Sequence, residues 1–211
     1  MIEYLLTKPP QFLIFVFIAL AATAAISFHE FAHARVAAWL GDPTGRLTGR
    51  MTLNPKRHLD PFGSFMVLIA GFGWGKPVPV APNRLRSRRG GRIWVALAGP
   101  LANAALAILA ALLIRLAKTT SISAGIVVEF LAIAVAVNVV FAVFNLLPIP
   151  PLDGFPILAE LLPPSRSEVI FFLERWGFLI LLVTGLILFR PVFGPALARV
   201  TAALLRLAGA A

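Results

Sequence analysis

Residues 11–40 have the sequence QFLIFVFIALAATAAISFHEFAHARVAAWL, and this stretch decides the fold class. Prolines 9 and 10 precede it, and Gly41-Asp42-Pro43 follows, which are typical start and stop signals of a helix. A helix of this length rises about 45 Å, more than the roughly 30 Å of a bilayer's hydrocarbon core. The stretch therefore predicts a transmembrane helix that tilts or protrudes at one end.

The composition of the whole chain agrees with a membrane location. Of its 211 residues, 59% are hydrophobic and 13% are charged, whereas soluble domains carry about 25% charged residues. Four more apolar stretches follow the first, at 93–116, 126–147, 168–189 and 191–211, and the first of these is interrupted by Gly99-Pro100. The sequence thus predicts an all-α integral membrane protein, a polytopic helical bundle of about five or six membrane segments.

Two segments do not fit a simple span. Pro61–Trp74 is apolar but too short to cross a bilayer with ease, so we expect a re-entrant segment there. Residues 191–211 form either a last span or a helix lying in the membrane interface. Lys76-Pro-Val-Pro-Val80 is extended because of its prolines, which predicts a small β-like loop or a plain connector.

The charged residues predict the orientation. The net charge is +10, and ten of the 19 Lys and Arg residues lie between Gly41 and Arg92. Basic residues collect in the cytoplasmic loops of membrane proteins, so this charge does not indicate nucleic-acid binding. With this stretch in the cytoplasm, the spans that end at Leu40 and Leu147 finish at the same inner face, provided that Pro61–Trp74 does not cross.

Ionisable residues stand inside the first span, as His29-Glu30-Phe-Ala-His33. Positions i and i+4 share one face of a helix, so both imidazoles can bind one metal ion. Glu30 lies on the adjoining face, where it can activate water as a general base. Such groups are costly within a membrane and are functional by default. The chain has no cysteine, so the remaining ligands must be His, Asp or Glu.

A catalytic zinc site needs a third protein ligand. Asp42 and Asp60 resemble turn or capping residues, His58 resembles a solvated loop histidine, and Glu129 begins a span at the opposite face. Asp153 is the strongest candidate. It follows the third span, in a proline-bounded turn that the topology brings to the same face as His33.

These motifs together resemble the site-2 protease family of intramembrane metalloproteases. The likeness is carried by 29–33 and by Asn145-Leu-Leu-Pro-Ile-Pro-Pro-Leu-Asp153-Gly154. Between them, four further stretches resemble compact prokaryotic members without a PDZ domain: Gly41-Asp-Pro, 54–61 (NPKRHLDP), 73–80 (GWGKPVPV) and 98–103 (AGPLAN). The resemblance implies one membrane-embedded metalloprotease domain over 1–211, with its core at about 12–185 and a hydrophobic tail at 191–211.

The resemblance also implies roles for individual residues. His29, His33 and Asp153 would bind one Zn²⁺, and Glu30 would activate the water. Asn145 would steady the oxyanion or the substrate backbone. Phe155 departs from the Gly or Ser that many members have after Asp-Gly.

The expected partners are a transmembrane protein substrate and the lipid bilayer, in a prokaryotic cell membrane with the active site near the cytoplasmic face. Lys76–Val80 would pair with an unwound substrate, as a β-loop does at this position in the family. The alternative is a transporter or metal-permeation protein that uses the intramembrane His, Glu and Asp residues as an ion pathway.

Overall fold

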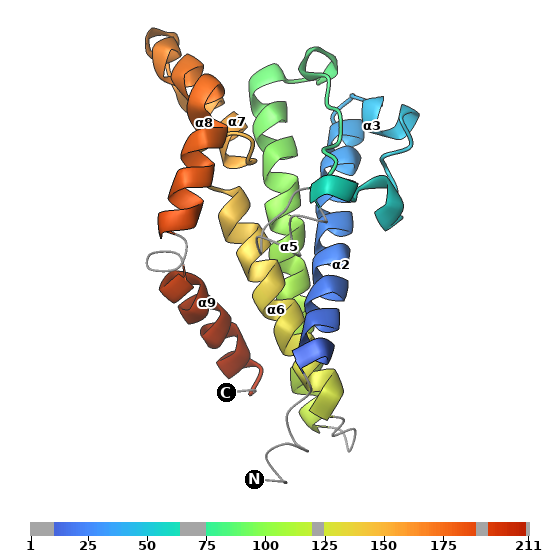
Figure 1. Cartoon of the computed structure of the whole chain (residues 1–211). Helices are drawn as coiled ribbons and strands as arrows, with labels where there is room; N and C mark the ends of the chain where they lie inside the picture. The colour runs from blue at the N-terminus through green and yellow to red at the C-terminus, as the bar shows by residue number, and fades with distance from the viewer. Residues whose placement is uncertain (1–10, 64–74, 120–124, 189–193, 210–211) are drawn as a thin grey trace.

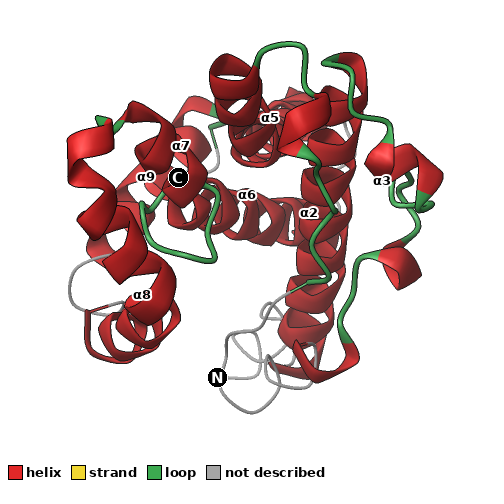
Figure 2. Ribbon diagram, turned by 90° about the horizontal axis from the view of Figure 1, so that it is seen from above, coloured by secondary structure: helices red, strands yellow, loops and turns green. Residues whose placement is uncertain are grey.

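The computed structural model describes residues 11–63, 75–119, 125–188 and 194–209, and most of these residues are helical. The helices are α2 (Gln11–Trp39), α3 (Thr44–Leu47), α5 (Arg88–Thr119), α6 (Gly125–Asn145), α7 (Gly154–Leu161), α8 (Ser167–Leu188) and α9 (Gly194–Leu207), with short 3-10 turns at Pro55–Arg57, Pro82–Arg84 and Pro164–Arg166. Figure 2 shows no strand within these ranges, which confirms the all-α prediction.

Three helices are long and apolar enough to cross a membrane: α2, α5 and α6. They pack side by side along most of their length and form the centre of the molecule (Figure 1). Small residues are buried on these helices, such as Ala25 on α2, Ala107 on α5 and Ala142 on α6. Small side chains let membrane helices approach closely, since lipid supplies no hydrophobic driving force between them.

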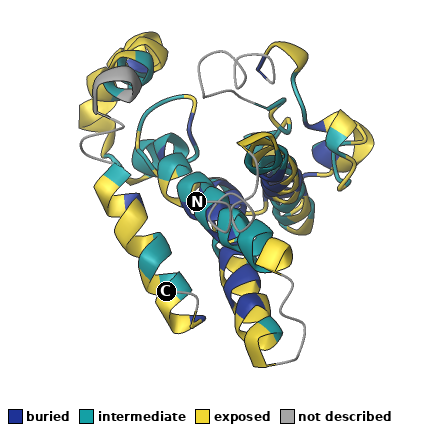
Figure 3. Ribbon diagram, turned by 60° about the horizontal axis from the view of Figure 1, so that its bottom comes forward, coloured by how far each residue is buried: buried dark blue, intermediate teal, exposed yellow. Residues whose placement is uncertain are grey.

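The C-terminal helices lie outside this centre, and Figure 3 shows most of their residues exposed. α9 packs against α6, and the Arg115 guanidinium and the Lys118 ammonium, near the end of α5, donate to the carbonyls of Leu207 and Gly209. α9 therefore runs along the bundle towards the end of α5. With 14 residues, α9 is shorter than the about 20 residues that a transmembrane helix needs, and the choice between a last span and an interfacial helix stays a prediction.

The expected interruption of the second span at Gly99-Pro100 is wrong. α5 is one continuous helix from Arg88 to Thr119, with Pro100 inside it. Proline removes one backbone donor, but neighbouring helices and polar side chains compensate for this in membrane helices. The helix also begins five residues before the predicted Ile93, in the basic loop.

The predicted re-entrant segment, Pro61–Trp74, lies for the most part outside the described residues. The adjoining chain carries one isolated antiparallel bridge, between Leu59 and Gly75, and the Lys76 N–H donates to the His58 carbonyl over 2.6 Å. Beyond Gly75 the described chain is extended without forming a ladder. The β-like loop is therefore an extended strap whose backbone hydrogen bonds go mainly to side chains of other segments.

Asp42 holds this strap against the end of α2. Its carboxylate accepts from the Thr44 N–H (3.0 Å) and hydroxyl (2.5 Å) and from the Ala81 N–H (2.6 Å). Burial raises the pKa of Asp42, but the hydrogen bonds from Thr44 and Ala81 outweigh burial and lower it. Asp42 is thus the turn residue that the sequence predicted, and it also links two distant loops.

The interpretation of His58 as a solvated loop residue is wrong. Its side chain is fully buried, and its Nε2 lies 2.6 Å from the Thr52 carbonyl oxygen. Lys56 and Arg57 are exposed to solvent and suggested the same for His58. The loop instead encloses the His58 side chain.

Candidate metal centre

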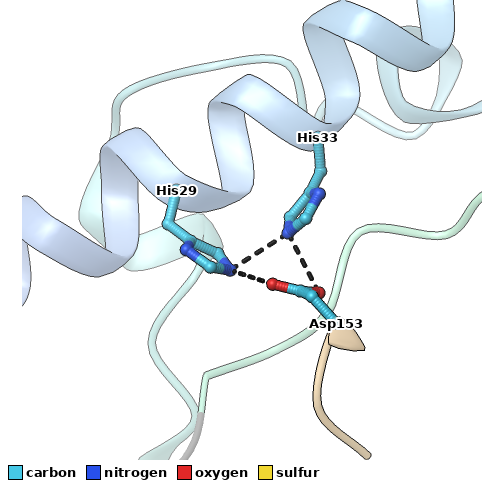
Figure 4. A group of neighbouring side chains, drawn as sticks. All are labelled: His29, His33 and Asp153. Carbon is cyan, nitrogen blue, oxygen red and sulfur yellow. Dashed lines mark hydrogen bonds and ion pairs between the residues drawn. The ribbon is translucent and has the colours of Figure 1, made fainter. Parts of the chain in front are cut away.

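Two imidazoles of α2 point at the same place. His29 and His33 are both buried, and their Nε2 atoms lie 3.0 Å apart. Their spacing of four residues puts them on one helix face, as the sequence predicted. They face the inside of the bundle, towards α5 and the turn that follows α6 (Figure 4).

Asp153 reaches these imidazoles from the other side. Its carboxylate oxygens lie 2.9 Å from His29 Nε2 and 3.3 Å from His33 Nε2 (Figure 4). Asp153 immediately precedes α7, and a Cβ on the next residue, Gly154, would lie 2.2 Å from the Leu146 carbonyl oxygen. Only glycine at position 154 allows the chain to lie this close to the Leu146 backbone. This close contact directs the preceding Asp153 towards the two imidazoles.

A second contact holds α7 in place. The Arg92 guanidinium on α5 lies 2.6 Å from the Glu160 carboxylate on α7. This ion pair holds α7, which begins beside Asp153, against α5, which forms one wall of the site. The convergence of two imidazoles and one carboxylate thus depends on α2, α5 and the turn between α6 and α7 together.

The three side chains suit a tetrahedral metal ion. Ligand atoms about 2.1 Å from a zinc ion lie about 3.4 Å from one another, and the separations here are 2.9–3.3 Å. An outward shift of a few tenths of an ångström therefore accommodates the ion. Asp153 Oδ2 is buried and makes no hydrogen bond, which is costly for a carboxylate oxygen unless a cation satisfies it.

Gly99 provides space for such an ion. A Cβ at this position would lie 2.4 Å from His33 Nε2 and 2.5 Å from His29 Nε2. The α5 backbone therefore lies directly against both ligand atoms, and any side chain at Gly99 would fill the site.

The other ring nitrogens of both histidines are also bonded. His33 Nδ1 donates to the Val95 carbonyl over 2.6 Å, and His29 Nδ1 lies 2.6 Å from the Asn103 side-chain oxygen. Histidine ligands of metals commonly donate their second N–H in this way, which orients the ring and leaves Nε2 unprotonated. Both rings therefore direct a lone pair at the site.

Comparison with known proteins identifies the family of this chain. A model of peptidase family M50 matches residues 111–184. The chain is 41% identical over 172 residues to "Putative zinc metalloprotease YwhC" of Bacillus subtilis (strain 168), and the match covers 78% of each protein. The chain belongs to the site-2 protease family, peptidase family M50. It is a membrane metalloprotease.

More distant relatives agree with this site-2 protease assignment. Proteins named "Putative zinc metalloprotease Rip2" are 32% identical over 180 residues in Mycolicibacterium smegmatis and 33% identical over 177 residues in Mycobacterium tuberculosis (strain H37Rv). Each match covers 81% of this chain and 66% of Rip2. No solved structure matches this site-2 protease.

Glu30 lies beside the metal site, next in sequence to His29. Its carboxylate oxygen Oε2 accepts a hydrogen bond from the backbone N–H of Val78 over 2.9 Å, and its charge acts on the His33 ring. The extended strap therefore covers Glu30 and fixes one carboxylate oxygen, while the other carries no bond to the strap.

The structure does not connect the remaining predicted residue, Asn145, with the three ligands. Its amide donates to the Phe141 carbonyl of its own helix over 3.0 Å. The rejected ligand candidates also lie elsewhere. Asp60 accepts from the Gly63 N–H, and among the described residues only His29, His33 and Asp153 form a cluster that fits a metal.

Two residues of the site escaped the sequence interpretation. The sequence predicts Gly99 as a helix interruption and includes Asn103 only in the stretch 98–103, although both lie directly against the rings of His29 and His33. They are four residues apart and so share one face of α5. That spacing is the one signal in the sequence that would have pointed to them.

Proposed function

We propose that this site-2 protease is an intramembrane zinc endopeptidase that cuts transmembrane protein substrates within or beside their membrane spans. The observation that supports the proposal most is the convergence of His29, His33 and Asp153, within 4.8 Å of one another, between helices long enough to cross a membrane. Two imidazoles and one carboxylate are a ligand set of catalytic zinc, which leaves a fourth position for water.

In this proposal His29, His33 and Asp153 hold the zinc ion, and Glu30 transfers protons. Zinc, when bound, lowers the pKa of water and polarises the scissile carbonyl group. The Glu30 carboxylate takes a proton from the attacking water and passes it to the amine that leaves. The Val78 N–H fixes one of its oxygens, so the proton is carried on the other.

We assign Asn145 to the oxyanion that forms when water attacks the carbonyl. One proton of its amide is used by the Phe141 carbonyl, and an amide NH₂ group carries two. The second proton can be donated to substrate. Asn145 is the last residue of α6, at the end where α6 approaches the Asp153 turn.

The strap residues 76–79 present a restricted edge to a substrate. In an extended chain, alternate residues direct their N–H and C=O groups to opposite sides. The N–H groups of Lys76 and Val78 face the protein itself, and the residues between and after them are Pro77 and Pro79, which have no N–H. An unwound substrate that pairs with the outer edge finds carbonyl acceptors there and no donor.

We place the site near the cytoplasmic face of the cell membrane. α2 ends in the same basic region from which α5 begins, and positive residues favour the cytoplasm. Cleavage at this depth releases the cytoplasmic part of a membrane protein, so regulated intramembrane proteolysis is the biological role that we propose.

Comparison of protein termini tests the proposal. Cells that lack the native gene product express either the wild type or Glu30→Gln, and mass spectrometry maps new protein termini in both. We expect termini that appear only with the wild type and fall within or next to transmembrane segments. Wild-type-dependent termini confined to soluble domains would contradict an intramembrane substrate. Zinc flux into proteoliposomes that persists in Glu30→Gln, without any such termini, would favour a metal-permeation protein.

A further inference from the structure

A buried pair of asparagines joins the three central helices beside the metal site. Asn103 on α5 is fully buried, and Asn138 on α6 is almost so. The Asn103 amide donates to the Ala25 carbonyl of α2 over 3.1 Å and to the Asn138 side-chain oxygen over 3.0 Å. Asn138 in turn donates to the Ala134 carbonyl of its own helix over 2.9 Å.

These contacts fix which way the Asn103 amide faces. A backbone carbonyl only accepts, so the group that faces Ala25 must be the NH₂. If the amide were turned over, its oxygen would face the Ala25 carbonyl oxygen, and a buried pair of acceptors would repel each other. The Asn103 oxygen is therefore directed at His29 Nδ1, which lies 2.6 Å away.

The direction of this oxygen determines where the ring proton of His29 lies. An amide oxygen accepts and does not donate, so Nδ1 must carry the proton. The neutral ring then has an unprotonated Nε2, the atom that lies 2.9 Å from Asp153 and 3.0 Å from His33 Nε2. For His33 the acceptor of the Nδ1 proton is the Val95 backbone carbonyl, which a substitution does not remove. For His29 the acceptor is the Asn103 side chain, so a substitution there can change where the ring proton lies.

We propose that Asn103 is a positioning residue that sets the ring tautomer and orientation of His29 for metal binding. This role rests on the proposed metal site and goes beyond it. Asn138 has a different part: it joins α6 to Asn103, and the Ala25 carbonyl suffices to orient the Asn103 amide without it.

Zinc affinity in matched variants separates positioning from simple contact between helices. Asn103→Leu removes the acceptor of His29, whereas Asn138→Leu removes the hydrogen bond between the two asparagines and keeps that acceptor. We expect zinc affinity, measured by chelator competition, to fall about 10- to 100-fold in Asn103→Leu. In Asn138→Leu it should stay within about threefold of the wild type. Equal losses in Asn103→Leu and Asn138→Leu would overturn the proposal.

The position of the ring proton gives a second readout that does not depend on activity. The chain has three histidines, so ¹⁵N-histidine labelling of the zinc-loaded wild type yields three ring systems that single substitutions assign. We expect the His29 proton on Nδ1. A proton on Nε2 would overturn the proposal even if Asn103→Leu fails to fold. A wild type that takes up no zinc would overturn the metal site instead.

Discussion

Glu30→Gln should lower kcat/KM by about 100- to 10,000-fold, the usual contribution of a general base, while the protein keeps its zinc. The amide of glutamine cannot accept a proton from water at neutral pH. Its oxygen still accepts from the Val78 N–H, which the Glu30 carboxylate holds at 2.9 Å. The strap therefore stays in place, and the loss of activity reports on proton transfer alone.

A matched control comes from the other acidic residue in a central span. Glu129 lies on α6, half-buried and outside the metal cluster. Glu129→Gln should leave kcat/KM within about twofold of the wild type. If Glu30→Gln behaves like Glu129→Gln in steady-state cleavage of the same substrate, Glu30 is not the base.

Gly99→Ala should abolish tight zinc binding although it removes no ligand. The new Cβ would lie 2.4–2.5 Å from both Nε2 atoms. The rings cannot withdraw easily, because Asn103 and the Val95 carbonyl hold their opposite nitrogens. We expect zinc affinity to fall by at least about 100-fold, at or beyond the upper limit found for residues that orient a ligand.

The helix itself favours this substitution. Alanine in a helix interior is more stable than glycine by up to about 1 kcal/mol, so a loss of zinc in folded Gly99→Ala points to the site. Gly125→Ala is the matched control, since a Cβ at Gly125 meets nothing within 4 Å. Calorimetric titration with zinc measures both variants, and unchanged affinity in Gly99→Ala would show that the metal lies elsewhere.

The sequence predicted the spans because each is a long apolar run, and it predicted the ligand pair because one helix carries both histidines. α2 ends at Trp39, one residue before the predicted end at Leu40. Asp153 followed from topology, since the first and third spans had to end at one face. These predictions needed only the local sequence pattern and the direction in which each span crosses the membrane.

The neighbours of the ligands required the tertiary structure. Nothing local indicates that Asn103 faces His29, which lies on another helix, or that the Gly99 backbone touches two rings. His58 shows the opposite error, because its basic neighbours suggested solvent while the loop folds over it. The Gly99-Pro100 pair misled because a proline ends helices in water, whereas packing within the bundle preserves α5.

Zinc content per chain tests the central claim most directly. Purified wild type, His33→Ala, Asp153→Ala and Asp60→Asn are measured by elemental analysis after identical dialysis. Asp60 serves as the control, because its carboxylate accepts from Gly63 and lies outside the metal cluster. We predict about one zinc per chain in the wild type and in Asp60→Asn, and little in the two ligand variants. Undiminished zinc in Asp153→Ala would contradict a site shared by α2 and the turn after α6.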